Sequence, residues 1–136
     1  MPDRTAFLAR LIGLYCLVAA CAMAFERDAW LAAVTALTGA APLMLILGML
    51  VVAAGLALVL SHNVWSGGAL PVAVTVIGWL TLAKGLMFWA LPPGSAADFY
   101  LTRLHYAELF YLYCAVSFAI GLYLTTAGFM RRPRAG

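Results

Sequence analysis

Four long apolar runs constrain this chain more than any other feature of its sequence. They fall at residues 6–25, 42–60, 70–91 and 104–129, each bounded by charged residues, proline or glycine. A helix that crosses a bilayer needs about 20 mostly apolar residues, so each run can span. Because 66% of the chain is hydrophobic and only 10% is charged, a water-soluble fold could not cover its apolar surface. The sequence predicts an all-α integral membrane protein, a four-helix transmembrane bundle with a single domain over residues 1–136.

The first run has a second interpretation. Arg4 lies before the run, Arg10 lies near its start, and Ala22-Met23-Ala24 lies near its end. Basic residues, an apolar stretch and a small-residue end are the pattern of a cleaved secretory signal peptide. We favour a retained helix, because the internal repeat described below needs this segment as a span.

The distribution of basic residues predicts the orientation of the spans. Five of the eight basic residues flank the first and last runs on the side of both termini: Arg4, Arg10, Arg131, Arg132 and Arg134. Cytoplasmic flanks of membrane helices carry an excess of Lys and Arg. We therefore expect both termini in the cytoplasm and the first and third loops outside. We interpret these arginines as topology signals and expect no nucleic-acid partner.

The two halves of the chain show a weak duplication. Two dipeptides recur at offsets of 65 and 66 residues, Ile12-Gly13 as Ile77-Gly78 and Gly55-Leu56 as Gly121-Leu122. Each half, at about 6–62 and 70–129, contains two spans, so both halves should have the same orientation about an axis along the membrane normal. We predict two tandem two-helix repeats in parallel orientation.

Small residues recur every seven positions within the spans. This spacing keeps one stripe facing a neighbouring helix, and small side chains let membrane helices approach closely. The glycines expected at helix contacts are Gly13, Gly48, Gly55, Gly78, Gly85, Gly121 and Gly128. A chance origin of the stripe is the alternative, because small residues are common in membrane helices.

The outer loops are predicted to correspond as well. Asp28 can cap a short helix that ends before Gly39, and Ser95, with Asp98 three residues later, can cap one through Arg103. Each half is therefore expected to hold a short interfacial helix between its two spans.

Lys84 is the only ionisable residue well inside a predicted span. A charge at the centre of a membrane helix costs at least roughly 2.5–3.5 kcal/mol on insertion scales, which makes it a functional candidate. Glu108 lies about one turn inside the outer end of the fourth run, at a comparable depth, with Glu26 as a reserve partner. We predict a structural Lys84–Glu108 ion pair. A role of Lys84 in moving an ion or substrate is the alternative.

Three further candidates, His62, Asn63 and Trp65, lie where the second run meets the cytoplasmic boundary. Trp65 is typical of an interfacial anchor. A single histidine at the end of a span is typical of a hydrogen-bonded packing residue, with metal or haem ligation as the alternative. His105 is expected on the opposite side of the membrane, so one haem could not use both histidines of a subunit.

The sequence contains no pattern that predicts catalysis. Carboxylate pairs, a Ser/His/Asp set, metal-spaced ligand clusters and a glycine-rich phosphate loop are all lacking, and the three cysteines form no C-x-x-C pair. We expect no enzyme activity, cofactor or metal. The aromatic residues of the third loop and fourth run are interpreted as an outer interfacial belt with helix packing: Phe99, Tyr100, Tyr106, Phe110, Tyr111 and Tyr113.

Two segments resemble a group of small uncharacterised bacterial four-span membrane proteins. They are Ser61-His62-Asn63-Val64-Trp65 and Ile77-Gly78-Trp79-Leu80-Thr81-Leu82-Ala83-Lys84-Gly85. The resemblance covers mainly the second and third runs. It implies a multi-pass protein of the bacterial inner membrane and singles out five motif positions: His62, Asn63, Trp65, Trp79 and Lys84.

The resemblance carries no established activity, so function is predicted from the sequence as a whole. We expect a non-enzymatic accessory or scaffold protein in the lipid bilayer, associated with itself or with other membrane subunits. The alternative is a small ion or solute channel or transporter that uses Lys84.

Overall fold

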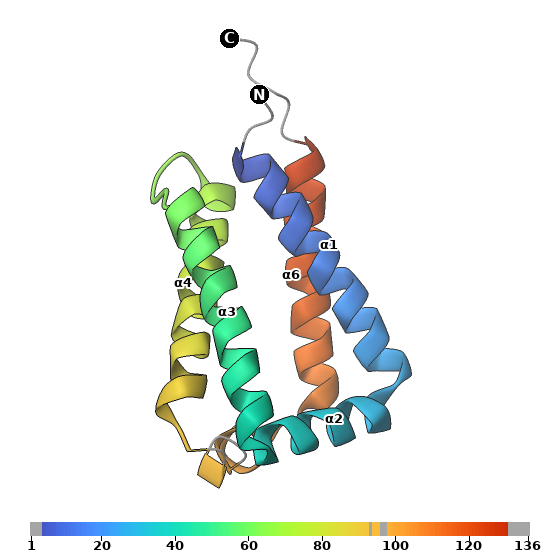
Figure 1. Cartoon of the computed structure of the whole chain (residues 1–136). Helices are drawn as coiled ribbons and strands as arrows, with labels where there is room; N and C mark the ends of the chain where they lie inside the picture. The colour runs from blue at the N-terminus through green and yellow to red at the C-terminus, as the bar shows by residue number, and fades with distance from the viewer. Residues whose placement is uncertain (1–3, 93, 96–97, 131–136) are drawn as a thin grey trace.

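The computed structural model describes residues 4–92, 94–95 and 98–130, and all of its elements are helical (Figure 1). The helices are α1 (Arg4–Phe25), α2 (Arg27–Gly39), α3 (Ala41–Ser61), α4 (Ala69–Ala90), the π-helix η1 (Asp98–Arg103) and α6 (Phe110–Met130). Four of them, α1, α3, α4 and α6, are long and apolar enough to cross a membrane. The prediction of an all-helical, multi-pass membrane protein is confirmed at this level.

Short connections with clear local causes join these helices. Glu26 alone separates α1 from α2, and Ala40 alone separates α2 from α3. Pro42 lies in the first turn of α3, where a missing amide hydrogen costs nothing. Gly67 and Gly68, with φ of 89° and 116°, form the turn before α4 in a backbone region that other residues rarely adopt.

The predicted start of the fourth span at residue 104 is wrong, because α6 begins at Phe110. His105 has a φ of 47°, in the left-handed region, which interrupts a right-handed helix. The hydroxyl of Tyr113 donates to the carbonyl of Leu104 at 2.8 Å and fixes this turn against α6. Residues 104–109 are therefore a connection, and the span is shorter than expected.

The short helices predicted for the first and third loops differ in detail from the prediction. The first, α2, is present, but its N-cap is Glu26 and no side chain caps it, so the capping role assigned to Asp28 is wrong. The second is the π-helix η1, which ends at Arg103 as expected and follows Ser95.

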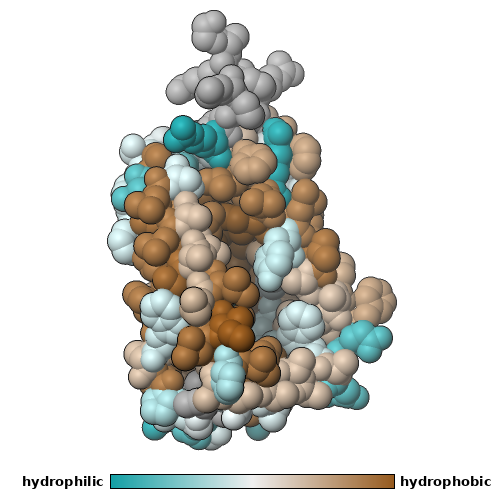
Figure 2. Space-filling view, in the orientation of Figure 1, coloured by the Kyte–Doolittle hydropathy of each residue, from teal (hydrophilic) through white to brown (hydrophobic). Residues whose placement is uncertain are grey.

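The four long helices pack as two antiparallel pairs, α1 with α6 and α3 with α4 (Figure 1). The start of α1, the end of α6 and the α3–α4 turn lie at one end of the molecule, the terminal end. Helix α2 crosses the other end, the α2 end, from one pair to the other. Near the terminal end, one buried cluster joins the pairs: Leu8, Ala9, Leu70, Val74 and Leu124. Hydrophobic residues cover most of the visible surface between the two ends (Figure 2).

Within each pair the helix backbones approach closely at glycine. A Cβ atom on Gly13 would lie 2.6 Å from the backbone nitrogen of Thr125, and one on Gly55 would lie 2.5 Å from the Cα of Leu82. The other five glycines of the predicted stripe also face the neighbouring helix of their pair: Gly48, Gly78, Gly85, Gly121 and Gly128. Van der Waals packing of this kind is what holds membrane helices together, since lipid tails are as apolar as the side chains.

The two pairs repeat the same contacts at nearly constant offsets in sequence. Three contacts in one pair correspond to three in the other: Gly13–Thr125 to Gly78–Val59, Leu17–Gly121 to Leu82–Gly55, and Met23–Phe110 to Phe88–Met44. In these contacts the residues of α1 are matched 65 positions later in α4, and those of α3 are matched 66 positions later in α6.

Candidate functional site

The α3–α4 turn at the terminal end brings together four of the residues singled out by the sequence. His62 is buried, and its backbone amide donates to the carbonyl of Leu58 at 2.8 Å, which closes α3. Its ring Nε2 lies 3.3 Å from the carbonyl oxygen of Pro71 on α4. Because a carbonyl only accepts, Nε2 carries the hydrogen. His62 thus lies as a hydrogen-bonded packing residue between α3 and α4.

Asn63 connects two indole rings in the same turn. Its Oδ1 accepts hydrogen bonds from Nε1 of Trp65 at 2.8 Å and from Nε1 of Trp79 at 3.4 Å. Both indoles remain exposed. Lys84, the fifth motif position, follows Trp79 by five residues, about 7.5 Å further along α4. The structure thus separates Lys84 from the other motif residues.

Thr75 completes this site, and sequence reasoning missed it. It is fully buried, and its Oγ1 accepts from the amide of Val64 at 3.0 Å and donates to the carbonyl of Val64 at 2.9 Å. One hydroxyl thereby satisfies both backbone groups of a residue that follows the end of α3. Its position in the sequence could have indicated this role, because Thr75 is the only hydroxyl residue between Pro71 and Trp79 and lies one helical turn before Trp79.

The predicted Lys84–Glu108 ion pair is wrong, because Glu108 has a different partner. Its Oε2 lies 3.2 Å from Nδ1 of His105, and the two side chains are 78% and 59% exposed. The cause is the late start of α6, which leaves Glu108 in the connection instead of inside a span. Lys84 is exposed on α4, with its Nζ 5.7 Å from the ring centroid of Phe88.

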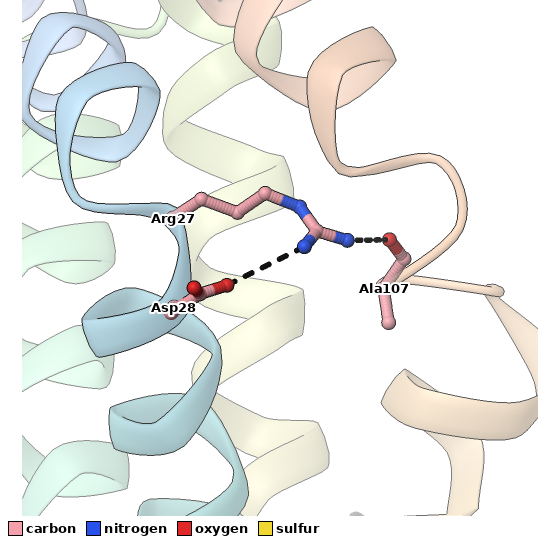
Figure 3. Close-up of polar contacts among 3 residues, drawn as sticks. All are labelled: Arg27, Asp28 and Ala107. Carbon is pink, nitrogen blue, oxygen red and sulfur yellow. Dashed lines mark hydrogen bonds and ion pairs between the residues drawn. The ribbon is translucent and has the colours of Figure 1, made fainter.

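A second group of polar contacts lies at the α2 end and is centred on Arg27 (Figure 3). One terminal guanidinium nitrogen donates to the carbonyl of Ala107 at 3.1 Å, and the other lies 3.5 Å from Oδ1 of Asp28. The guanidinium carbon also lies 5.7 Å from the ring centroid of Phe110 and 5.8 Å from that of Tyr111. Arg27 therefore fastens the start of α2 to the connection before α6.

Aromatic contacts strengthen the same junction. Trp30 on α2 donates from Nε1 to the hydroxyl of Tyr106 at 3.2 Å. The Tyr106 ring stacks on Tyr113 at 5.4 Å and meets Phe110 edge-on at 5.9 Å. Burial raises the pKa of the Tyr106 hydroxyl, and the hydrogen bond from Trp30 opposes this shift. Phe110 is fully buried against Met23, so this member of the expected interfacial belt is a core residue.

Metal-ligating residue types do not gather in the described part of the chain. No group of three His, Cys, Asp or Glu residues there could hold a metal ion, and Cys16, Cys21 and Cys114 are free thiols. Comparison with family models, with curated proteins and with solved structures finds no match to this chain.

Proposed function

We propose that this chain is a non-enzymatic accessory or scaffold protein of the bacterial inner membrane, which binds other membrane helices or further copies of itself through its lateral surface. One observation carries the proposal. Large apolar side chains are exposed along all four spans, for example Tyr15, Leu50, Leu80 and Tyr111. This surface is broad enough to serve lipid and protein partners together.

The polar contacts at the two ends support a structural role. Thr75 and His62 hold the α3–α4 turn against α4, and Arg27 and Trp30 hold α2 against the connection before α6. These side chains bind groups of the same chain and stiffen both ends. A stiff pair of ends fixes the shape that the lateral surface presents to a partner.

We also propose that the fold consists of two tandem repeats in parallel orientation. The matching contacts support this, because a twofold rotation that places α1 on α4 and α3 on α6 converts the α1–α6 pair into the α4–α3 pair. Each pair then contains one helix from each repeat, so neither repeat could bury its own glycine stripe alone. Superposition of residues 6–62 on 70–129 without inversion is the test.

The orientation with both termini in the cytoplasm belongs to the same proposal. The basic flanks support it, as does the common position of the start of α1 and the end of α6. Reporter fusions after residue 136 and at Ser66 should read cytoplasmic, and a fusion at Ala33 should read external. An external signal at Ser66 would contradict the assignment.

A channel or transporter is the second candidate, and one observation favours it. Lys84 places a charge at an exposed position within a membrane-spanning helix, where a charge needs a reason. Flux of small ions in proteoliposomes that disappears in Lys84→Met but not in Leu80→Met would support this candidate.

Purification in a gentle detergent, followed by mass spectrometry of the co-purifying proteins, tests the scaffold proposal. We expect a stoichiometric membrane partner or a homo-oligomer. A monomer without any protein partner, combined with a flux that depends on Lys84, would overturn the proposal.

A further inference from the structure

One face of α4 runs from the contact between the two helix pairs into an open region. Leu70 and Val74 on this face are 8% and 1% exposed, within the cluster that joins the pairs. Ile77, Thr81 and Lys84 continue the face at helical spacing. Ile77 and Thr81 are half-buried and Lys84 is exposed. Phe88, one turn further along this face, is buried against Met44 of its own helix pair.

Helix α1 shows the same pattern on the face that meets α4. Ala9 is fully buried in the cluster that joins the pairs, and Ile12, Cys16 and Ala19, further along this face, are only half-buried. Met23, one turn beyond Ala19, is buried against Phe110 of its own helix pair. The two pairs therefore diverge from the terminal end toward the α2 end.

The length of α2 explains why the pairs diverge. Its 13 residues extend over about 20 Å at 1.5 Å per residue, and single residues join it to α1 and α3. Packed helices lie only about 8–10 Å apart. Helix α2 thus keeps α1 and α3, which belong to different pairs, from packing at this end.

Lys84 lies close to the end of α4 that is at the α2 end of the molecule. It is six residues before the last residue of α4, about 9 Å along the helix, and its Nζ lies 5.7 Å from the ring centroid of Phe88. A lysine stem can carry its charge from such a position to the membrane boundary at the helix end.

Neighbouring hydroxyl groups donate to backbone carbonyls. Thr81 donates to Ile77 at 2.7 Å, and Ser117 on α6 donates to Cys16 at 3.5 Å. The region between the diverging pairs therefore combines apolar walls with a positive charge near one membrane boundary. A molecule that complements both features has an anionic head and apolar chains.

We propose that an anionic phospholipid of the leaflet at the α2 end binds between the two helix pairs, with its phosphate at the Lys84 amino group and an acyl chain along the faces of α1 and α4. An ammonium group donates charge-assisted hydrogen bonds to phosphate oxygens. The lipid fills the region that α2 keeps open. This site does not depend on which protein partner the scaffold binds.

Native mass spectrometry of the full chain in a mild detergent tests this site. The probes are phosphatidylglycerol and phosphatidylcholine with identical chains, offered at equal concentration. The wild type should retain phosphatidylglycerol preferentially. Lys84→Met should reduce that preference by about tenfold or more, because a hydrogen bond to a charged group is lost. Lys84→Arg should keep the preference, and so should the control Leu80→Met, which changes an exposed residue of α4 without changing charge.

Three results would overturn the lipid site. The first is equal retention of the two lipids by the wild type. The second is a Lys84→Met protein that unfolds at the same temperature as the wild type and keeps the wild-type preference for phosphatidylglycerol. The third is a Lys84-dependent chloride or phosphate flux without lipid preference, which would identify a site for small free anions. If Lys84→Met loses the preference for phosphatidylglycerol but has also unfolded, Lys84→Gln is measured at a temperature where it is folded. Loss of the preference in folded Lys84→Gln supports the lipid site, and an unchanged preference overturns it. Co-purification of protein partners is measured separately, so failure of the lipid site leaves the scaffold proposal intact.

Discussion

Replacing Gly55 by alanine should separate the α3–α4 pair. The new Cβ would lie 2.5 Å from both the Cα and the backbone nitrogen of Leu82, atoms that cannot rotate away. Ordinary van der Waals contact begins near 3.4 Å, so the helices must move apart by about 0.9 Å. Overpacking typically costs about 1–3 kcal/mol, and alanine recovers about 1 kcal/mol of helix propensity. Because the clash is with backbone, we expect a net loss of about 1–2 kcal/mol.

Thermal unfolding in detergent, followed by loss of helical circular dichroism, measures this effect. Gly39→Ala is the matched control, because a Cβ there meets nothing within 4 Å. It should be neutral or slightly stabilising. If Gly55→Ala were as stable as Gly39→Ala, the close approach of the α3 and α4 backbones would be refuted, and with it the basis of the paired architecture.

Three further predictions concern the ends of the molecule. Thr75→Val should lower the free energy of unfolding by about 2 kcal/mol, because the backbone amide and carbonyl of Val64 both lose their partner. The control Thr126→Val, which removes a hydroxyl bonded within its own helix, should change stability little. Equal effects of the two changes would contradict the role given to Thr75. Arg27→Gln should loosen α2 and speed hydrogen exchange of its amides, and unchanged exchange would show that Arg27 does not fasten it. Burial raises the pKa of Tyr106, so the neutral hydroxyl stabilises the fold below about pH 10, and this stabilisation is lost as the pH rises further. The stability of Tyr106→Phe should therefore fall less at alkaline pH than that of the wild type. An equal fall in the two proteins would contradict the prediction.

The sequence predicts helices more reliably than it predicts their neighbours. Apolar runs of about 20 residues predict the four long helices, because a segment that crosses lipid must satisfy its own backbone as an uninterrupted helix. A seven-residue stripe of glycine identifies the face that packs but not the helix it packs against. The pairing of α1 with α6 and α3 with α4 depends on the length of α2 and on contacts between distant residues.

Glu108 illustrates why the candidate site was only partly predictable. Its apolar neighbours extend the fourth run back to residue 104, and nothing local indicates the left-handed backbone of His105. The hydrogen bond from Tyr113 to Leu104 fixes that turn, and it is a contact of the folded chain. The motif around His62 was more predictable, because residues 62–65 and 75–79 are joined by a short turn and must lie close together.

Photo-crosslinking in intact membranes tests the central claim that the lateral surface binds protein. A photoreactive amino acid is placed at Leu50 or Leu80, which are 65% and 64% exposed, and for comparison at Ser66 in the α3–α4 turn. A scaffold should give a discrete crosslinked protein band from at least one of the two lateral positions, whether a second copy or another membrane subunit, and no such band from Ser66. Crosslinks to lipid alone from both lateral positions would contradict the proposed function.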